Sequence, residues 1–287
     1  MERVLFGDNQ FFGVNHASEE KARAQSIHFR DAESIIRVLD IAMEADIKVF
    51  MCTTHTKIGE ITDHVRKNPA KYKQLEFYPC MPYAHKYANA MAEHGPVDAL
   101  RQLLPNNGSM MGAIVKGGIS LAGLNVKGLA ELLIDAEMNM FHGLRTPVIF
   151  LQNVVTDLLL GIGFHEAFRT FADHVRTKYN AEAGFITMNL PALLVALKEV
   201  GIINPIICST INKAGFRMPG GLSAYENALK EHEFRPVAMS VLASGAISPK
   251  EAIEYVCGLP KVESIVFGAS TRQNIFETKR LIDAFSS

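Results

Sequence analysis

Short apolar runs alternate with longer amphipathic stretches along this chain, and the alternation repeats eight times. The apolar runs are rich in β-branched and aromatic residues and are bounded by turn-forming residues, as buried strands are. We expect strands at residues 4–7, 47–52, 75–81, 148–151, 185–188, 205–209, 236–242 and 264–267.

The stretches that separate these runs carry apolar residues at helical spacing. We expect helices at residues 31–44, 57–66, 126–141, 165–178, 192–200, 223–232, 249–257 and 274–285. One boundary is well marked, because Ser248 can cap a helix, Pro249 suits its first position and Glu251 can complete a capping box. A strand followed by a helix, eight times over, predicts an α/β fold of the (β/α)8 TIM-barrel class.

The length of the chain indicates one barrel domain over residues 1–287. With 48% hydrophobic side chains the chain can bury a large core, and barrels of this size form single domains. Residues 82–124 are too many for one turn, so we expect an insertion after the third strand that acts as a lid or binding loop. Residues 111–116 could instead form an extra strand.

Composition and charge narrow the classes of partner. A formal net charge of −1 without a lysine or arginine cluster gives no reason to expect nucleic acid or an anionic membrane, so we expect a small-molecule ligand. The four cysteines lack paired short spacings and the N-terminus lacks a leader-like segment, which indicates a cytoplasmic protein with reduced thiols. The longest apolar region, residues 148–164, is interrupted by polar residues and is not expected to span a membrane.

Polar side chains gather just after the predicted strands, at the end where TIM barrels carry their active sites. Burying an unpaired amide or hydroxyl costs about 1–3 kcal/mol, so this dense set, which includes Asp8, Gln10 and Ser240, predicts a ligand pocket. A structural role is the alternative for each residue alone, since an asparagine can satisfy turn backbone and a lysine or arginine can be solvated. We predict substrate contacts from Asn9, His16, Cys52, Gln152, Asn153, Asn189, Lys213 and Arg217.

Four of these polar residues can move protons near neutral pH. His55, His85, Lys86 and Tyr83 are of types whose pKa values shift toward neutrality on burial or beside charge, so we predict them as the catalytic acids and bases. A metal site built from Cys52 and nearby histidines is the alternative. Because the chain lacks the close His-x-His pair typical of barrel metallohydrolases, no metal is expected.

The last unit of the chain has the features of an anion site. Gly268-Ala269-Ser270 ends the last predicted strand, and Ser270 with Gln273 fits a capping box at the start of the last helix. A capped helix start offers N–H groups and a positive dipole end, so we predict phosphate binding here with Arg272 as a fixed cation. The alternative is that Ser270 only caps the helix.

The C-terminal third resembles the aldo-keto reductase superfamily. The resemblance is carried by Ser240-Val-Leu-Ala-Ser-Gly245, by the helix that begins at Pro249 and by Gly268-Ala-Ser with Ile275 and Glu277. The order of elements agrees with that family over most of the chain, and in the family the last two units hold the phosphates of NADPH. The resemblance therefore implies a cofactor-binding set of Ser244, Gly245, Ser270, Thr271 and Arg272 around a phosphate, with Glu277 near an adenine.

The residues at the catalytic end depart from the family pattern. Met51 and Thr56 stand where the family has its aspartate and its acid tyrosine. The family lysine falls near Met81, with Lys86 the nearest lysine, and the family histidine falls at residue 152 or 153. The usual proton-transfer residues of these reductases are therefore replaced.

The residues that would hold a nicotinamide ring are also changed. Asn189 is retained, but Met188, Cys208 and Met239 stand where serine, glutamine and the stacking tyrosine are expected. Hydride transfer needs the ring held against the substrate carbon, so ordinary reductase chemistry is not expected.

Together the residues favour an aldo-keto-reductase-like barrel enzyme that acts on a small polar molecule, with or without a phosphate. The chemistry that we expect is general acid–base catalysis of the lyase or isomerase kind. The alternative is an atypical NADP-dependent oxidoreductase, which the phosphate-end residues support. A third hypothesis is a non-catalytic ligand-binding protein, which needs no pocket group that titrates near neutral pH.

Overall fold

The computed structural model describes residues 1–13, 27–83 and 126–286, and within them eight parallel strands close into a barrel. Each strand pairs with its neighbours in sequence order, and β1 closes the barrel against β8 through pairs such as Val4 with Ile265. The predicted TIM-barrel fold is confirmed. The strands are β1 (Val4–Gly7), β2 (Val49–Thr53), β3 (Glu76–Met81), β4 (Val148–Leu151), β5 (Glu182–Thr187), β6 (Ile206–Thr210), β7 (Arg235–Met239) and β8 (Ser264–Phe267).

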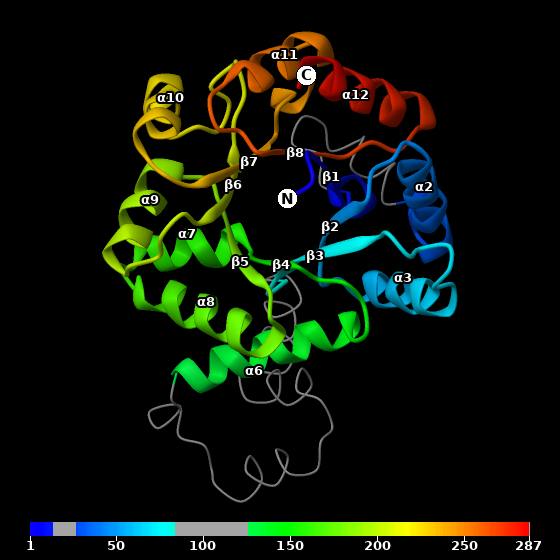
Figure 1. Ribbon diagram of the computed structural model, residues 1–287, viewed down its shortest axis with the longest axis horizontal. Helices are drawn as coiled ribbons and strands as arrows, with labels where there is room; N and C mark the ends of the chain where they lie inside the picture. The colour runs from blue at the N-terminus through cyan, green and yellow to red at the C-terminus, as the bar shows by residue number, and fades with distance from the viewer. Residues whose placement is uncertain (14–26, 84–125, 287) are drawn as a thin grey trace, which may run out of the picture.

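Helices surround the strands as an outer ring, which Figure 1 shows in a view along the barrel. Ser248 caps one of them by accepting from the Glu251 N–H at 3.4 Å, which confirms the boundary expected at Pro249. The helices of the described residues are α2 (Ala32–Glu44), α3 (Thr56–Lys67), α6 (Val126–Met138), α7 (Asn153–Gly161), α8 (Glu166–Tyr179), α9 (Leu190–Glu199), α10 (Gly221–Glu231), α11 (Pro249–Gly258) and α12 (Arg272–Phe285).

One of these helices differs from the sequence expectation. Between β4 and β5 the alternation predicts a single helix at residues 165–178, whereas the structure has two, α7 and α8. The apolar residues that follow β4 lack the polar face by which a surface helix is recognised, since Val154, Leu158 and Ile162 remain exposed. The extra helix places its N-terminal residue, Asn153, at the mouth of the barrel.

Alternate side chains of each strand enter two separate hydrophobic layers. In β2, Val49 and Met51 face the barrel interior, while Phe50 and Cys52 pack against the surrounding helices. This alternation follows from the two-residue repeat of a strand, and it decides which side chains can reach a site inside the barrel.

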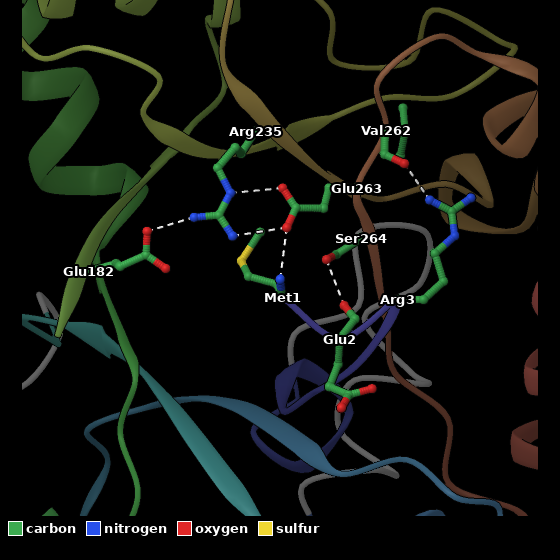
Figure 2. Close-up of polar contacts among 8 residues, drawn as sticks. All are labelled: Met1, Glu2, Arg3, Glu182, Arg235, Val262, Glu263 and Ser264. Carbon is green, nitrogen blue, oxygen red and sulfur yellow. Dashed lines mark hydrogen bonds and ion pairs between the residues drawn. The ribbon is translucent and has the colours of Figure 1, made fainter.

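A network of ion pairs closes the N-terminal end of the barrel (Figure 2). The Arg235 guanidinium donates two hydrogen bonds to Glu263, at 2.8 and 2.9 Å, and one to Glu182 at 2.6 Å. The Met1 amine donates to Glu263 at 2.8 Å. These residues lie at the starts of β5, β7 and β8, and they tie three strands together away from the site end.

The expected insertion at residues 82–124 falls outside the described residues from position 84 onward. The same holds for the extra strand considered at residues 111–116. None of the helices in the described ranges combines the length and the apolar character that crossing a membrane requires.

Candidate functional site

A cavity of about 430 Å3 opens at the C-terminal ends of the strands. Its rim is polar, and side chains from inside the barrel form an apolar floor. A wider hollow beside Arg3 and Cys257 lies at the opposite end, away from the strand ends at which TIM barrels carry out chemistry. The rim includes Asp8, Asn9, Gln10, Thr53, Gln152, Asn153, Ser240 and Ser244, and the floor includes Met51, Cys80, Ile186, Cys208, Met239 and Val266.

Asp8 is the titratable group that stands out in this cavity. It follows β1 directly, lines the cavity and is only 5% exposed. Burial raises the pKa of its carboxyl from 3.8 to about 6, although hydrogen bonds from Thr53 and from its own backbone amide act in the opposite direction. The carboxyl therefore changes charge close to neutral pH, as a proton-transfer group must.

Thr53, the last residue of β2, holds this carboxyl. Both its backbone N–H and its hydroxyl donate to Asp8 Oδ2, each at 2.7 Å. The negative charge of Asp8 in turn raises the pKa of the Tyr83 hydroxyl, after the larger effect of burial on that group. Asp8 thus lies where β1, β2 and β3 end. The residues at the ends of β2 and β3 are among those that differ from the catalytic residues of the aldo-keto reductases.

Asp157 offers a useful contrast, because its pKa is also raised by burial. Its carboxylate accepts from the Thr187 hydroxyl at 2.5 Å and from the Met188 N–H at 3.0 Å, and it does not line the cavity. Asp157 therefore fixes the end of β5, and Asp8 remains the acid that faces the cavity.

Two of the predicted catalytic residues, His55 and Tyr83, contact each other just after the ends of β2 and β3, at the same end of the barrel as this cavity. The His55 ring stacks on Phe12 at 4.3 Å between ring centres and meets the edge of Tyr83 at 5.6 Å. Its Nδ1 accepts from the Lys57 N–H at 3.1 Å and so caps α3. Burial and the charge of Lys57 lower the pKa of His55, so its ring is neutral at neutral pH and carries its proton on Nε2.

The rings of Phe12, His55 and Tyr83 form an aromatic cluster, and neither His55 nor Tyr83 is among the described lining residues of the cavity. The other predicted catalytic residues, His85 and Lys86, lie outside the described residues, as does the predicted substrate residue His16. Their roles stay predictions.

The predicted substrate residues divide into two groups. Asn9, Gln152 and Asn153 line the cavity and can contact a ligand there. Asn189 lies at the same end but caps α9, because its Oδ1 accepts from the Ala192 N–H at 3.4 Å. Cys52 faces the helical layer, since the alternation along β2 directs Met51 and Thr53 to the cavity instead.

The two predicted cationic contacts also lie elsewhere. Lys213 is exposed and pairs with Glu251 at 2.7 Å, and the Arg217 guanidinium lies 5.4 Å from the centre of the Phe216 ring. Neither residue lines the cavity. Within the described lining, the charged group is therefore the acid Asp8, with no cation beside it.

The loop that follows β7 contributes Ser244 and Gly245 to the cavity wall. This loop contains four left-handed residues: Ser240, Ala243, Ser244 and Gly245 have φ values of 54°, 46°, 59° and 90°. Left-handed conformations cost a non-glycine residue about 1–2 kcal/mol, and they cluster where a backbone is shaped for a ligand.

The rest of the predicted cofactor set lies beyond this cavity. Ser270, Thr271, Arg272 and Glu277 are absent from its described lining, and Glu277 is exposed on α12. Arg272 forms an ion pair with Glu44 and lies 4.7 Å from the centre of the Phe276 ring. The capping box expected at Ser270 is wrong, since Thr271 takes the cap position and accepts from the Asn274 N–H at 3.3 Å.

The cavity floor contains four sulfur-bearing side chains, Met51, Cys80, Cys208 and Met239. Burial raises the pKa of the Cys80 and Cys208 thiols, so both stay protonated at neutral pH and behave as small apolar groups. In the described part of the chain, no three side chains of His, Cys, Asp or Glu converge as a metal site would need.

Gln10 fits against Gly268 at the edge of the cavity. Its Nε2 donates to the Gly7 carbonyl at 2.8 Å, while its buried Oε1 has no hydrogen-bond partner. A Cβ at position 268 would lie 2.0 Å from that Oε1. The glycine of the Gly-Ala-Ser sequence is therefore needed for the close approach of the Gln10 amide.

Comparison of the whole fold connects this barrel with reductases. No family model and no curated protein sequence matches the chain. The chain is similar in structure to a Pseudomonas aeruginosa protein assigned to the aldo-keto reductases, with a TM-score of 0.60 and 12% identity over 100% of this chain and 91% of that one.

Two further solved structures give the same result. An aldo-keto reductase from Bacillus halodurans in its holo form has a TM-score of 0.56 and 11% identity, over 98% of this chain and 86% of that one. An aldo-keto reductase from Klebsiella pneumoniae in complex with NADPH has a TM-score of 0.53 and 11% identity, over 99% of this chain and 86% of that one. The protein therefore has a (β/α)8 barrel similar to that of solved aldo-keto reductases, and the resemblance seen in the sequence is confirmed for the fold.

Proposed function

We propose that the protein is an enzyme that transfers a proton to or from a small polar molecule at the mouth of the barrel, with Asp8 as the proton carrier. The observation that carries this proposal is a buried carboxyl that faces the cavity and has a pKa of about 6. A group of this kind is present in both protonation states near neutral pH, and it can therefore act as an acid and as a base.

The chemistry of the cavity suggests the kind of molecule that would bind. Asp8 accepts hydrogen bonds when ionised, while Asn9, Gln152 and Asn153 can both donate and accept. The carboxylate of Asp8 in the lining repels an anionic ligand, which supports a neutral ligand with hydroxyl or carbonyl groups over a phosphorylated one. The charge of Asp8 also affects Tyr83, so a ligand beside Asp8 could extend toward the aromatic cluster of Tyr83 and His55.

An NADP-dependent oxidoreductase is the second candidate, and the comparisons favour it over a lyase or isomerase. Its support is that the structural neighbours are aldo-keto reductases, one of them in complex with NADPH. The left-handed loop at Ser244 and Gly245 and the exposed Arg272 guanidinium at the start of α12 suit a phosphate. NADPH would supply a hydride, and Asp8 could then provide the accompanying proton.

The nicotinamide end of the cofactor does not fit the described residues. Asn189 is engaged as the cap of α9, and Met239 offers a thioether where a ring would need an aromatic face. Cys208 carries a protonated thiol, which is a poor partner for a carboxamide. We therefore route no step through the nicotinamide, and the proposal rests on proton transfer by Asp8, which both candidates require.

One pair of assays separates the candidates. Hydroxycarbonyl compounds incubated in D2O with the protein are expected to gain deuterium beside the carbonyl, as monitored by NMR, and Asp8→Asn is expected to slow this exchange by about 10²- to 10⁴-fold. The same compounds are then tested for oxidation of NADPH, measured by its absorbance.

Exchange without NADPH oxidation would support a lyase or isomerase, and oxidation that depends on Asp8 would support the oxidoreductase. Activity that is unchanged in Asp8→Asn would contradict the proposal. Ligand binding without either reaction would favour the non-catalytic binding protein.

A further inference from the structure

Thr53 donates two hydrogen bonds to Asp8, and these bonds do more than link the ends of β1 and β2. We propose that Thr53 is a positioning residue, which fixes one oxygen of the Asp8 carboxylate and leaves the other oxygen for the ligand. This inference rests on the proposed role of Asp8. Thr53 is not a catalytic residue in this scheme, because it acts through the carboxylate.

The geometry supports this role. The backbone N–H and the hydroxyl of Thr53 both reach Asp8 Oδ2 at 2.7 Å, so two donors from one residue converge on one oxygen. Apart from the backbone amide of Asp8 itself, no other described residue donates to this carboxyl. The side chain of Asp8 can therefore not rotate without breaking two hydrogen bonds, and its orientation toward the cavity is fixed.

The position of Thr53 in the barrel explains why it can do this. Gly7 pairs with Met51, so the residues that follow β1 lie level with the end of β2. Alternation along β2 sends Met51 and Thr53 toward the cavity and Cys52 away from it. The Thr53 side chain thus points to the same side as Asp8, and its backbone N–H donates to Asp8 Oδ2.

The same contacts affect the charge state of Asp8. Hydrogen bonds to the ionised form lower the pKa of Asp8 and so oppose the effect of burial, which raises it. Without the Thr53 hydroxyl, the ionised form loses one charged hydrogen bond. A bond of this type changes a proton equilibrium by about tenfold or more.

The experiment is a pH titration of Asp8 in the full chain, followed by NMR of the carboxyl carbon in protein labelled at aspartate. Asp8→Asn identifies the signal by removing it. Thr53→Val keeps the size and branching of the side chain but lacks the hydroxyl, and Thr53→Ser keeps the hydroxyl. The matched control is Thr210→Val, since Thr210 also ends a strand, and within the described residues its hydroxyl hydrogen-bonds only to Met188 Sδ, at 3.9 Å.

We expect Thr53→Val to raise the proton affinity of Asp8 by about tenfold, and Thr53→Ser and Thr210→Val to titrate like the wild type. An unchanged titration in Thr53→Val, or an equal change in Thr53→Ser, would overturn the inference. If Thr53→Val does not fold by circular dichroism, Thr53→Ala serves as the hydroxyl deletion.

Failure of this inference can be distinguished from failure of the proposed function. A shifted titration in Thr53→Val, combined with deuterium exchange that survives Asp8→Asn, would keep Thr53 as the positioning residue and reject Asp8 as the proton carrier. The reverse combination would keep Asp8 and reject Thr53.

Discussion

Replacing Asp8 by asparagine is expected to stabilise the folded protein at alkaline pH while it removes the proton carrier. Burial raises the pKa of Asp8 from 3.8 to about 6, so the folded state binds a proton more tightly than the unfolded chain does. The stability that the protonated carboxyl contributes is fully present below pH 4 and is lost as the pH rises through 6. At about 1.4 kcal/mol per tenfold change in proton affinity, the ionised carboxyl costs the folded state about 3 kcal/mol at pH 8.

Asparagine avoids this cost, because its neutral side chain can still accept both hydrogen bonds from Thr53. Those bonds are weaker to a neutral acceptor, so the expected gain in unfolding free energy at pH 8 is about 1–3 kcal/mol. At pH 4 the gain should disappear. The assay is urea unfolding of both proteins at the two pH values, followed by circular dichroism.

The control is Asp31→Asn. Asp31 caps α2 at the surface, and its hydrogen bonds with Ser34 lower its pKa, so this change should not stabilise the protein at pH 8. If Asp8→Asn raised the unfolding free energy equally at both pH values, or did not raise it at pH 8, the idea that burial raises the pKa of Asp8 would be refuted.

Three further predictions test other parts of the structure. Gly268→Ala should cost about 1–3 kcal/mol of stability and distort the cavity, because its Cβ would lie 2.0 Å from Gln10 Oε1. The control, Gly59→Ala in α3, has open space around its Cβ and should stabilise the protein slightly. Equal melting temperatures of the two variants would argue against the contact. Glu263→Gln should lower the stability by about 1 kcal/mol at pH 7. This difference should vanish as the pH falls toward 2, because Arg235 lowers the pKa of Glu263 to about 2. A difference that persists during urea unfolding at acid pH would contradict the ion-pair explanation. Arg272→Ala should weaken NADPH binding in calorimetry by about 1.5–3 kcal/mol, and Glu44→Gln should not weaken it. Equal affinities of the wild type and both variants would mean that Arg272 pairs with Glu44 and does not bind NADPH.

The sequence predicted the barrel because the evidence for it is local. Each strand is a short apolar run and each helix has its own periodicity, so eight repeats can be counted without knowing how they meet. Within the described residues the sequence missed α7, since an apolar helix with exposed Val154 and Leu158 lacks the usual pattern. Most strand ends were also predictable, although β7 ends at Met239 and not at residue 242 as expected. Asn9, Gln152 and Asn153 do line the cavity.

Tertiary structure decided which of the polar residues face the cavity and how strongly each is perturbed. The side chains of Cys52 and Thr53 point to opposite sides of β2. Cys52, predicted to contact substrate, therefore faces the helices, while Thr53, for which nothing was predicted, lines the cavity. Asn189 and Thr271 were drawn into helix caps, which only the positions of neighbouring N–H groups reveal. In the sequence, an acidic residue directly after the first strand was the one signal for Asp8.

The pKa of Asp8 is the clearest example of a property that the local sequence does not predict. A carboxylate next to a strand has a pKa of about 4 unless something removes water from it and raises that pKa. Here the closed barrel does so, and the donors that oppose the effect come from Thr53, 45 residues away along the chain. Sequence periodicity determines the strands, but burial and electrostatics depend on all eight strands closing around the same space, and only the folded structure sets them.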